Sequence, residues 1–156
     1  MDGLRQRYPD ITFKGVAADL SKKTSVSEYS ELVENDLAGL DIGIVCLNAG
    51  CMIQGPTDLT SDSDYERIIN LNALHVAYFT KAILPHLMSR GSRSALLLTS
   101  SMLSTIPLPG LSMYTATKAF VTNFAEALHY EIRHLVDVTS WECGPTFTNL
   151  FGEGEE

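Results

Sequence analysis

Residues 41–50 read DIGIVCLNAG, an apolar run that ends in a small and polar turn. Short apolar runs bounded by turn residues predict buried strands. The same kind of run occurs at 11–18 (ITFKGVAA) and 94–99 (SALLLT), and residues 136–141 (VDVTSW) alternate between apolar and polar side chains. The sequence therefore predicts strands at 11–18, 42–47, 94–99 and 136–141.

Longer segments with helical spacing separate these runs. Apolar residues recur every three to four positions over about 24–38, 62–89 and 112–134, which predicts three helices. Strands that alternate with helices predict an α/β fold in one domain, residues 1–156, with a parallel sheet covered on both faces. Ligands bind such sheets beyond the carboxyl ends of the strands, so functional residues are expected directly after them.

Hydroxyl side chains stand where two of the helices are expected to begin. Thr60 or Ser61 precedes the second helix, and Ser112 precedes the third. Such a side chain caps a helix by accepting a hydrogen bond from a backbone N–H of the first turn. Both helix starts are therefore predicted to be capped.

Tyr114 and Lys118 lie four residues apart at the start of the third predicted helix. This spacing places the phenol and the ammonium on one helical face. A nearby cation favours the phenolate form, so such a tyrosine can exchange a proton with an alcohol or carbonyl oxygen. A lone pair with this spacing is also typical of a half-exposed helix with no catalytic role, and that alternative stays open.

Other polar residues accompany this pair. Ser101 stands thirteen residues before Tyr114, at the end of a predicted strand, and Asn48-Ala49-Gly50 follows another strand. Asn72 is a polar residue on an apolar helix face. Each of these features alone is also typical of an ordinary turn or of a satisfied buried amide.

Together these residues resemble the classical short-chain dehydrogenases/reductases. The family has an Asp after its third strand, an NNAG motif, a catalytic Asn, a Ser, YxxxK and a PG-containing loop. The matching positions, which cover almost the whole chain, are Asp19, LNAG at 47–50, Asn72, Ser101, Tyr114 with Lys118, and Cys143-Gly144-Pro145 followed by Thr148. The chain departs from the pattern in reading LNAG and CGP.

The resemblance implies roles for four catalytic residues. Tyr114 would be the acid/base, and Lys118 would support it while contacting the nicotinamide ribose, so that both residues also belong to the cofactor site. Ser101 would orient the substrate oxygen. Asn72 would hold a water that links Lys118 to solvent.

The resemblance also implies a binding site for NADP or NAD. Asp19 would lie by the adenine, Asn48, Ala49 and Gly50 near the adenosine ribose, and Thr148 near the carboxamide. The implied reaction is reduction of a ketone or oxidation of a secondary alcohol, with hydride transferred between the nicotinamide and the reacting carbon.

Two stretches, YTATKAFVTNFAEALHYEI and LDIGIVCLNAG, look most like the very-long-chain 3-oxoacyl-CoA reductase and 17-beta-hydroxysteroid dehydrogenase branch. This likeness implies a hydrophobic ketone from lipid or steroid metabolism and favours NADPH. It also implies a homodimer formed through the helices at 62–89 and 112–134. An inactive family member that acts through protein association is the alternative.

Family members begin with a strand and a TGxxxGxG turn that binds the pyrophosphate. No such motif occurs here. The sequence therefore predicts an incomplete Rossmann-like, doubly wound sheet without the first two strands and the phosphate loop. Residues 11–18 would lack a neighbour, and strand 42–47 would have an uncovered edge.

Composition excludes several other functions. A net charge of −8, with no run of Lys or Arg longer than two, argues against a nucleic-acid partner. The four His and three Cys residues are not in metal-ligand spacing, so no metal site is expected. The three thiols are predicted to be buried and reduced. Trp141 is predicted to lie in the core. No apolar leader is present, which predicts a cytoplasmic chain as given, or an endoplasmic-reticulum protein if a longer form carries an N-terminal anchor.

Overall fold

The computed structural model of the chain describes residues 2–145. It contains a parallel three-stranded sheet in the order β1 (Ile44–Leu47), β2 (Ser94–Ser101), β3 (Val136–Cys143). Ile44 lies opposite Ala95, and Ser101 lies opposite Cys143. The predicted parallel sheet is confirmed, and its three strands fall at three of the four predicted strand positions.

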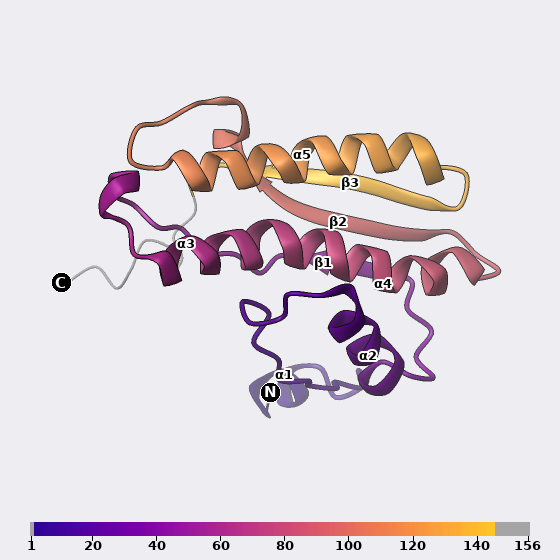
Figure 1. The fold of residues 1–156 in the computed structure, drawn as a ribbon. Coiled ribbons are helices and arrows are strands. Elements are labelled where there is room, and N and C mark those ends of the chain that lie inside the picture. Colours follow the sequence, from indigo (N-terminus) through magenta and orange to yellow (C-terminus); the bar gives the residue numbers. More distant parts are fainter. Residues whose placement is uncertain (1, 146–156) are drawn as a thin grey trace.

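Helices separate the strands. They are α1 (Asp2–Arg7), α2 (Val26–Asp36), α3 (Asp62–Ile69), a π-helical turn (Asn70–Leu74), α4 (His75–Ser89) and α5 (Ser112–Ile132), with short 3-10 turns at Thr57–Leu59 and Met102–Thr105. In Figure 1 the rod of α3, the π-helical turn and α4 runs in the same general direction as α5; α5 contacts α3 and the π-helical turn, and α2 packs against α4. The predicted helix 62–89 is thus one rod with an irregular turn near its middle.

The helix starts differ in how they are capped. Ser61 accepts a hydrogen bond from the backbone N–H of Asp64, as predicted for α3. The predicted cap of α5 is wrong: Leu111 occupies the cap position with no side-chain bond. The hydroxyl of Ser112 instead bonds that of Thr57 at 2.9 Å, because Ser112 already belongs to the first turn.

Residues 11–18 form no strand, so that prediction is wrong. Ile11 is 55% exposed and Val16 is 40% exposed. A strand is stabilised by a neighbouring ladder, and within residues 2–145 none lies beside this segment. These residues therefore form no regular secondary structure, in keeping with the expectation that they would lack a neighbouring strand.

The core lies between the sheet and the helices. Leu96 and Leu98 of β2 and Val138 of β3 are at most 5% exposed. They pack in one apolar cluster with Ile83 of α4 and Val121 of α5. Burying an aliphatic side chain of this size contributes about 1.5–3 kcal/mol, so this layer joins the two long helices to the sheet.

Side chains on the opposite face of the sheet are exposed. Ile44 is 71% exposed, Trp141 is 57% exposed, and Cys46 is also exposed. Among the described residues the large helices lie against the other face (Figure 1). The predictions that Trp141 belongs to the core and that the Cys46 thiol is buried are therefore wrong. Within residues 2–145 no helix is long and apolar enough to cross a membrane.

Candidate active site

A cleft of about 920 Å³ opens at the carboxyl ends of β1 and β2, beside the start of α5. Open parallel sheets bind their ligands at this end. Among the predicted site residues, those that line the cleft are Asn48, Ala49, Gly50, Ser101, Tyr114 and Lys118.

Tyr114 and Lys118 lie on the buried side of the first two turns of α5. Tyr114 is 6% exposed and Lys118 is 5% exposed. The Lys118 Nζ lies 5.8 Å from the centroid of the Tyr114 ring and donates a 2.8 Å hydrogen bond to the carbonyl of Thr99. Burial lowers the pKa of Lys118, because removal from water disfavours the charged ammonium.

Asn72 lies directly behind this pair and is 1% exposed. Its Oδ1 accepts from the backbone N–H of Cys51 at 2.9 Å, and its Nδ2 donates to the Cys51 carbonyl at 2.8 Å. The Nδ2 also lies 3.3 Å from the hydroxyl of Thr117, on α5. Asn72 therefore joins the turn after β1 to the helix that carries Tyr114.

Gly50 occupies a place where a side chain would be crowded. A Cβ there would lie 3.2 Å from Asn72 Oδ1 and 3.5 Å from Lys118 Nζ. The absent side chain lets the turn approach both groups closely.

The helix between β1 and β2 changes its hydrogen-bond pattern at this place. In the π-helical turn Asn70–Leu74, the backbone N–H of His75 bonds the carbonyl of Asn70. Single π turns in helices are frequent at functional sites. Asn70 donates from Nδ2 to the carbonyl of Ser21 at 3.1 Å, so two amides from one turn hold two different loops.

Ser100 and Ser101 at the end of β2 have different partners. The Ser101 hydroxyl accepts from the backbone N–H of Leu103 at 3.2 Å and lines the cleft. The Ser100 hydroxyl donates to the carbonyl of Lys118 at 2.9 Å and bonds Thr122 at 2.7 Å. Both serines line the cleft, but the Ser100 hydroxyl is engaged in joining β2 to α5, whereas the Ser101 hydroxyl accepts from Leu103 and can still donate to a ligand.

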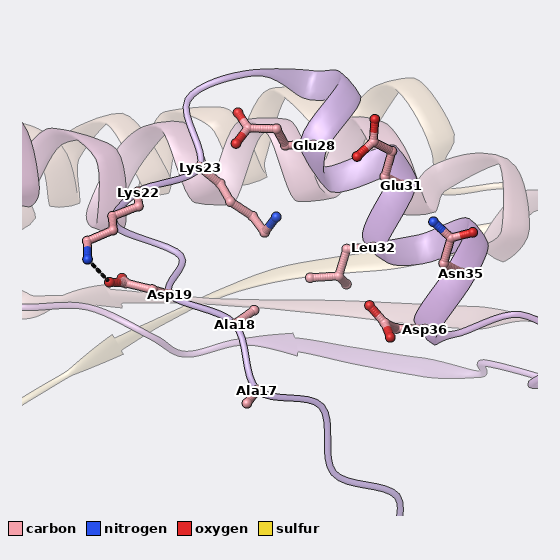
Figure 2. A pocket seen from close by; sticks show the side chains of 10 residues that line it. All are labelled: Ala17, Ala18, Asp19, Lys22, Lys23, Glu28, Glu31, Leu32, Asn35 and Asp36. Carbon is pink, nitrogen blue, oxygen red and sulfur yellow. Dashed lines mark ion pairs between the residues drawn. The ribbon is translucent and has the colours of Figure 1, made fainter.

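Asp19 lies away from the cleft. It lines a separate polar pocket of about 410 Å³ between the loop before α2 and α2 itself, where Figure 2 shows it paired with Lys22. A hydrogen bond from the Ser21 hydroxyl lowers the pKa of Asp19. Thr148, the predicted contact of the carboxamide, lies outside the described residues.

A family model described as short chain dehydrogenase matches residues 4–156. The chain belongs to the short-chain dehydrogenase family. It is 37% identical over 127 residues to the human very-long-chain 3-oxoacyl-CoA reductase, 33% over 136 residues to the Mus musculus protein of that name, and 34% over 130 residues to the human 17-beta-hydroxysteroid dehydrogenase type 3. These matches cover 79%, 85% and 82% of this chain, but 39%, 42% and 40% of the relatives. The chain thus spans about two fifths of the length of these relatives.

Solved short-chain dehydrogenases share its fold. The enzyme from Sphingobium yanoikuyae in complex with NADPH is 26% identical, with a TM-score of 0.82 over 97% of this chain and 59% of that one. The enzyme from Streptomyces avermitilis is 28% identical, with a TM-score of 0.80 over 98% and 55%. An enzyme from Burkholderia phymatum in complex with NAD reaches 0.83 over 96% and 53%, and its 20% identity supports the fold alone. The predicted Rossmann-like fold of this family is confirmed.

Several residues of this short-chain dehydrogenase site were not predicted from the sequence. Thr99 donates from its hydroxyl to Asn48 Oδ1 at 2.8 Å and provides the carbonyl that binds Lys118. Arg67 also lines the cleft. The position of Thr99 at a strand end was a usable signal, whereas nothing in the sequence pattern around Arg67 distinguishes it from a solvated helix charge. Within residues 2–145, no group of three His, Cys, Asp or Glu side chains is arranged to hold a metal ion.

Proposed function

We propose that this chain carries the reacting centre of an NAD(P)-dependent oxidoreductase that interconverts a ketone and a secondary alcohol on a hydrophobic substrate. The observation that carries this proposal is the gathering of Tyr114, Lys118 and Ser101 around one cleft. These three side chains provide a phenol, a cation and a hydroxyl, which are the groups that such a reaction requires.

Tyr114 would exchange the proton. In ketone reduction its hydroxyl donates a proton to the carbonyl oxygen, and in alcohol oxidation the phenolate accepts one. The role proposed for the ammonium of Lys118, 5.8 Å from the Tyr114 ring centroid, is to offset negative charge that develops on the Tyr114 oxygen during proton transfer, because an opposite charge acts more strongly where water is scarce. The Ser101 hydroxyl would donate a hydrogen bond to the same substrate oxygen.

The residues of the cleft fit a nicotinamide dinucleotide. Gly50 lets the turn after β1 lie close to Lys118, and the amide of Asn48 and the ammonium of Lys118 offer hydrogen-bond donors to ribose hydroxyls. Ala49 and Gly50 would hold the ribose side, with Asp19 at the adenine and Thr148 at the carboxamide. When bound, the reduced dinucleotide would supply the hydride for ketone reduction, and the oxidised form would accept it in alcohol oxidation. We favour NADPH for this chain, the cofactor bound by the neighbour from Sphingobium yanoikuyae, over NAD, the cofactor bound by the neighbour from Burkholderia phymatum.

Asn72 acts in this proposal mainly by positioning. Its side-chain amide is engaged by Cys51 and Thr117. It thereby fixes the turn that forms one wall of the cleft. A water held by Asn72 beside Lys118 would complete a path for the proton from solvent.

The substrate would be apolar near its ketone. The apolar part of the cleft lining is Met52, Met102, Leu103, Leu111 and Trp141. Flexible methionine and leucine side chains accommodate acyl chains and fused rings. Relatives named 3-oxoacyl-CoA reductase and 17-beta-hydroxysteroid dehydrogenase support a 3-oxoacyl-CoA or a steroid-like ketone.

We also propose that the chain pairs with a second copy through α5 and the helix pair α3–α4. Phe120 and Phe124 stack at 5.8 Å between ring centroids, with Phe120 42% exposed, and Tyr130 on the same helix is 64% exposed. Exposed aromatic residues of this kind are enriched at protein interfaces. Sedimentation of the chain and of Phe120→Glu tests this, because a charge at the interface would shift a dimer towards monomer.

The test of the reaction is a titration of the chain with NADPH and with NADH, followed by nicotinamide fluorescence, and then turnover of a 3-oxoacyl-CoA. Tyr114→Phe should retain cofactor binding and lose turnover by about 10²–10⁴-fold, the usual contribution of acid–base catalysis. Tyr130→Phe, an exposed tyrosine on the same helix, is the matched control and should retain both. Equal turnover in the chain and Tyr114→Phe would contradict the assignment.

A further inference from the structure

The cleft differs in charge from the rest of the chain. The sequence has 19 acidic and 11 basic residues, yet the described lining of the cleft contains Arg67 and Lys118 and no carboxylate. Lys118 is 5% exposed, and its ammonium is bonded to the Thr99 carbonyl. The Arg67 side chain is 50% exposed. Of these two cations, Arg67 is therefore the one that a ligand arriving from solvent meets first.

Arg67 is held in place by its own helix. Its Nη2 donates to Asp64 Oδ1 at 3.1 Å, and Asp64 Oδ2 in turn accepts from the hydroxyl of Ser61, the cap of α3, at 2.9 Å. The next residue, Ile68, is 1% exposed and anchors this turn in the protein. A guanidinium has five N–H donors in a rigid fork, and the Asp64 contact involves one of its nitrogens.

The charge of Arg67 acts at the wall of the cleft. Burial raises the pKa of the Cys51 thiol; among nearby charges the guanidinium of Arg67 lowers it most, and its ion-pair partner Asp64 acts in the opposite direction. Cys51 follows Gly50 directly, and both residues line the cleft. Arg67 therefore lies near the turn after β1 and close to the ligand space.

We propose that Arg67 binds a phosphate group of the ligand in this cleft, an inference that rests on the proposed function. A planar guanidinium binds phosphate through two parallel hydrogen bonds. The cleft then combines an apolar part with a cation, and this pattern fits an amphipathic ligand. A fatty acyl thioester of coenzyme A has an apolar chain and a phosphate-bearing carrier, whereas a neutral steroid has no group for Arg67. We therefore assign the phosphate that Arg67 binds to a coenzyme A thioester. The pyrophosphate of the dinucleotide offers the same phosphate oxygens, so the experiment includes both ligands.

Binding can be measured without turnover, because Trp141 is the single tryptophan of the chain and lines the cleft. Its fluorescence should be followed during titration with octanoyl-CoA, with S-octanoyl-pantetheine, which has the same thioester but no phosphate, and with NADPH. The variants are Arg67→Gln and Arg67→Lys. Arg93→Gln is the matched control: it removes the same charge from an exposed ion pair with Asp137, and Arg93 does not line the cleft.

The expected result is that Arg67→Gln weakens octanoyl-CoA binding about five- to tenfold, the size of one lost charge-assisted contact at a half-exposed site. Binding of S-octanoyl-pantetheine should not change, Arg67→Lys should lie between, and Arg93→Gln should match the unaltered chain. Added salt should weaken octanoyl-CoA binding more in the unaltered chain than in Arg67→Gln. Weakening of NADPH binding alone would support the phosphate site and assign it to the dinucleotide.

The proposal would be overturned if Arg67→Gln bound octanoyl-CoA and NADPH as tightly as the unaltered chain does. Equal weakening of octanoyl-CoA and S-octanoyl-pantetheine binding would also overturn it, because the second ligand has no phosphate. So would a failure of the unaltered chain to bind either octanoyl-CoA or NADPH. A failed oxidoreductase proposal looks different. In that case octanoyl-CoA binds through Arg67, but no 3-oxoacyl-CoA is turned over with NADPH or NADH.

Discussion

The side-chain amide of Asn72 holds both backbone polar groups of Cys51, with its Oδ1 2.9 Å from the N–H nitrogen and its Nδ2 2.8 Å from the carbonyl oxygen. Twenty-one residues separate the two positions along the chain. This clamp joins the turn after β1 to the helical rod α3–α4, and it places Gly50 against Lys118. The stability of the cleft wall therefore depends on one buried amide.

Asn72→Ala should lower the free energy of unfolding by about 1–3 kcal/mol, because it leaves the N–H and carbonyl of Cys51 without partners in a part-buried place. Urea unfolding followed by circular dichroism measures the change. Asn123→Ala is the control, since the Asn123 side chain is exposed and bonds only the carbonyl of Ala119 on its own helix. A loss of the same size in both variants would show that the clamp contributes nothing specific.

Gly50→Ala should destabilise the chain by about 1–3 kcal/mol, the usual effect of overpacking. The new Cβ would lie 3.2 Å from Asn72 Oδ1, a group that is fixed by Cys51 and cannot retreat freely. Thermal unfolding and NADPH titration should both show the change. Gly91→Ala provides the comparison, because a Cβ at Gly91 meets nothing within 4 Å; similar behaviour of the two variants would contradict the crowding.

Ser100→Ala and Ser101→Ala should affect different properties. Loss of the Ser100 hydroxyl removes bonds to the Lys118 carbonyl and to Thr122, so unfolding free energy should fall by about 1 kcal/mol. Loss of the Ser101 hydroxyl removes one bond, from the backbone N–H of Leu103, and should reduce ketone turnover far more than Ser100→Ala does, since the Ser101 O–H lines the cleft and makes no bond as a donor to a described residue. Measuring both quantities on both variants provides the test, and an interchange of the two effects would refute the assignment.

His75 should make stability depend on pH. Burial lowers its pKa, because the ring is 2% exposed between α2 and α4 and packs near Tyr29 and Phe79. Above the unfolded-state pKa of about 6.5, the ring is neutral in both the folded and the unfolded chain, so His75 does not make the free energy of unfolding depend on pH. As the pH falls from that value towards the lower folded pKa, the unfolded chain binds a proton that the folded chain does not, so stability is lost.

The measurement is the free energy of unfolding at several pH values from 7 down to about 5, a range that starts just above the histidine pKa. His75→Gln retains a donor for the carbonyl of Leu71 and removes the titrating ring, so its stability should change less with pH. His86→Gln, an exposed residue of α4, should retain the slope of the unaltered chain. An unchanged slope in His75→Gln would place the pH dependence elsewhere.

Much of this site could be predicted from the sequence because it is built from strand ends and from residues spaced along one helix, which are local features of the chain. The apolar run that ends at Leu47 and the run that ends at Thr99 form adjacent parallel strands. Their carboxyl ends bring Asn48, Gly50 and Ser101 to the same cleft. The spacing of Tyr114 and Lys118 needs only a helix to bring the two groups together, and α5 provides it.

Two predictions were wrong because their outcome depended on which element lies beside the segment. Residues 11–18 have the composition of a strand, but among the described residues no ladder stands beside them, so they do not pair. Trp141 alternates correctly along β3, yet its face of the sheet is not covered by α4 or α5, and it is exposed. Composition predicts what a segment favours, whereas pairing and burial depend on what lies next to it.

The sequence by itself determined the order of three strands and the helices between them, the parallel sheet, and the presence of a phenol, a cation and a hydroxyl near one edge, because strand and helix periods are local properties. Only the tertiary structure decided which groups those side chains contact. Asn72 holds Cys51, Ser100 bonds the Lys118 carbonyl, and Asp19 lies in a pocket of its own. A hydrogen bond requires two groups within about 3 Å in a suitable direction, and for residues far apart in the chain that distance is set by how the helices pack on the sheet.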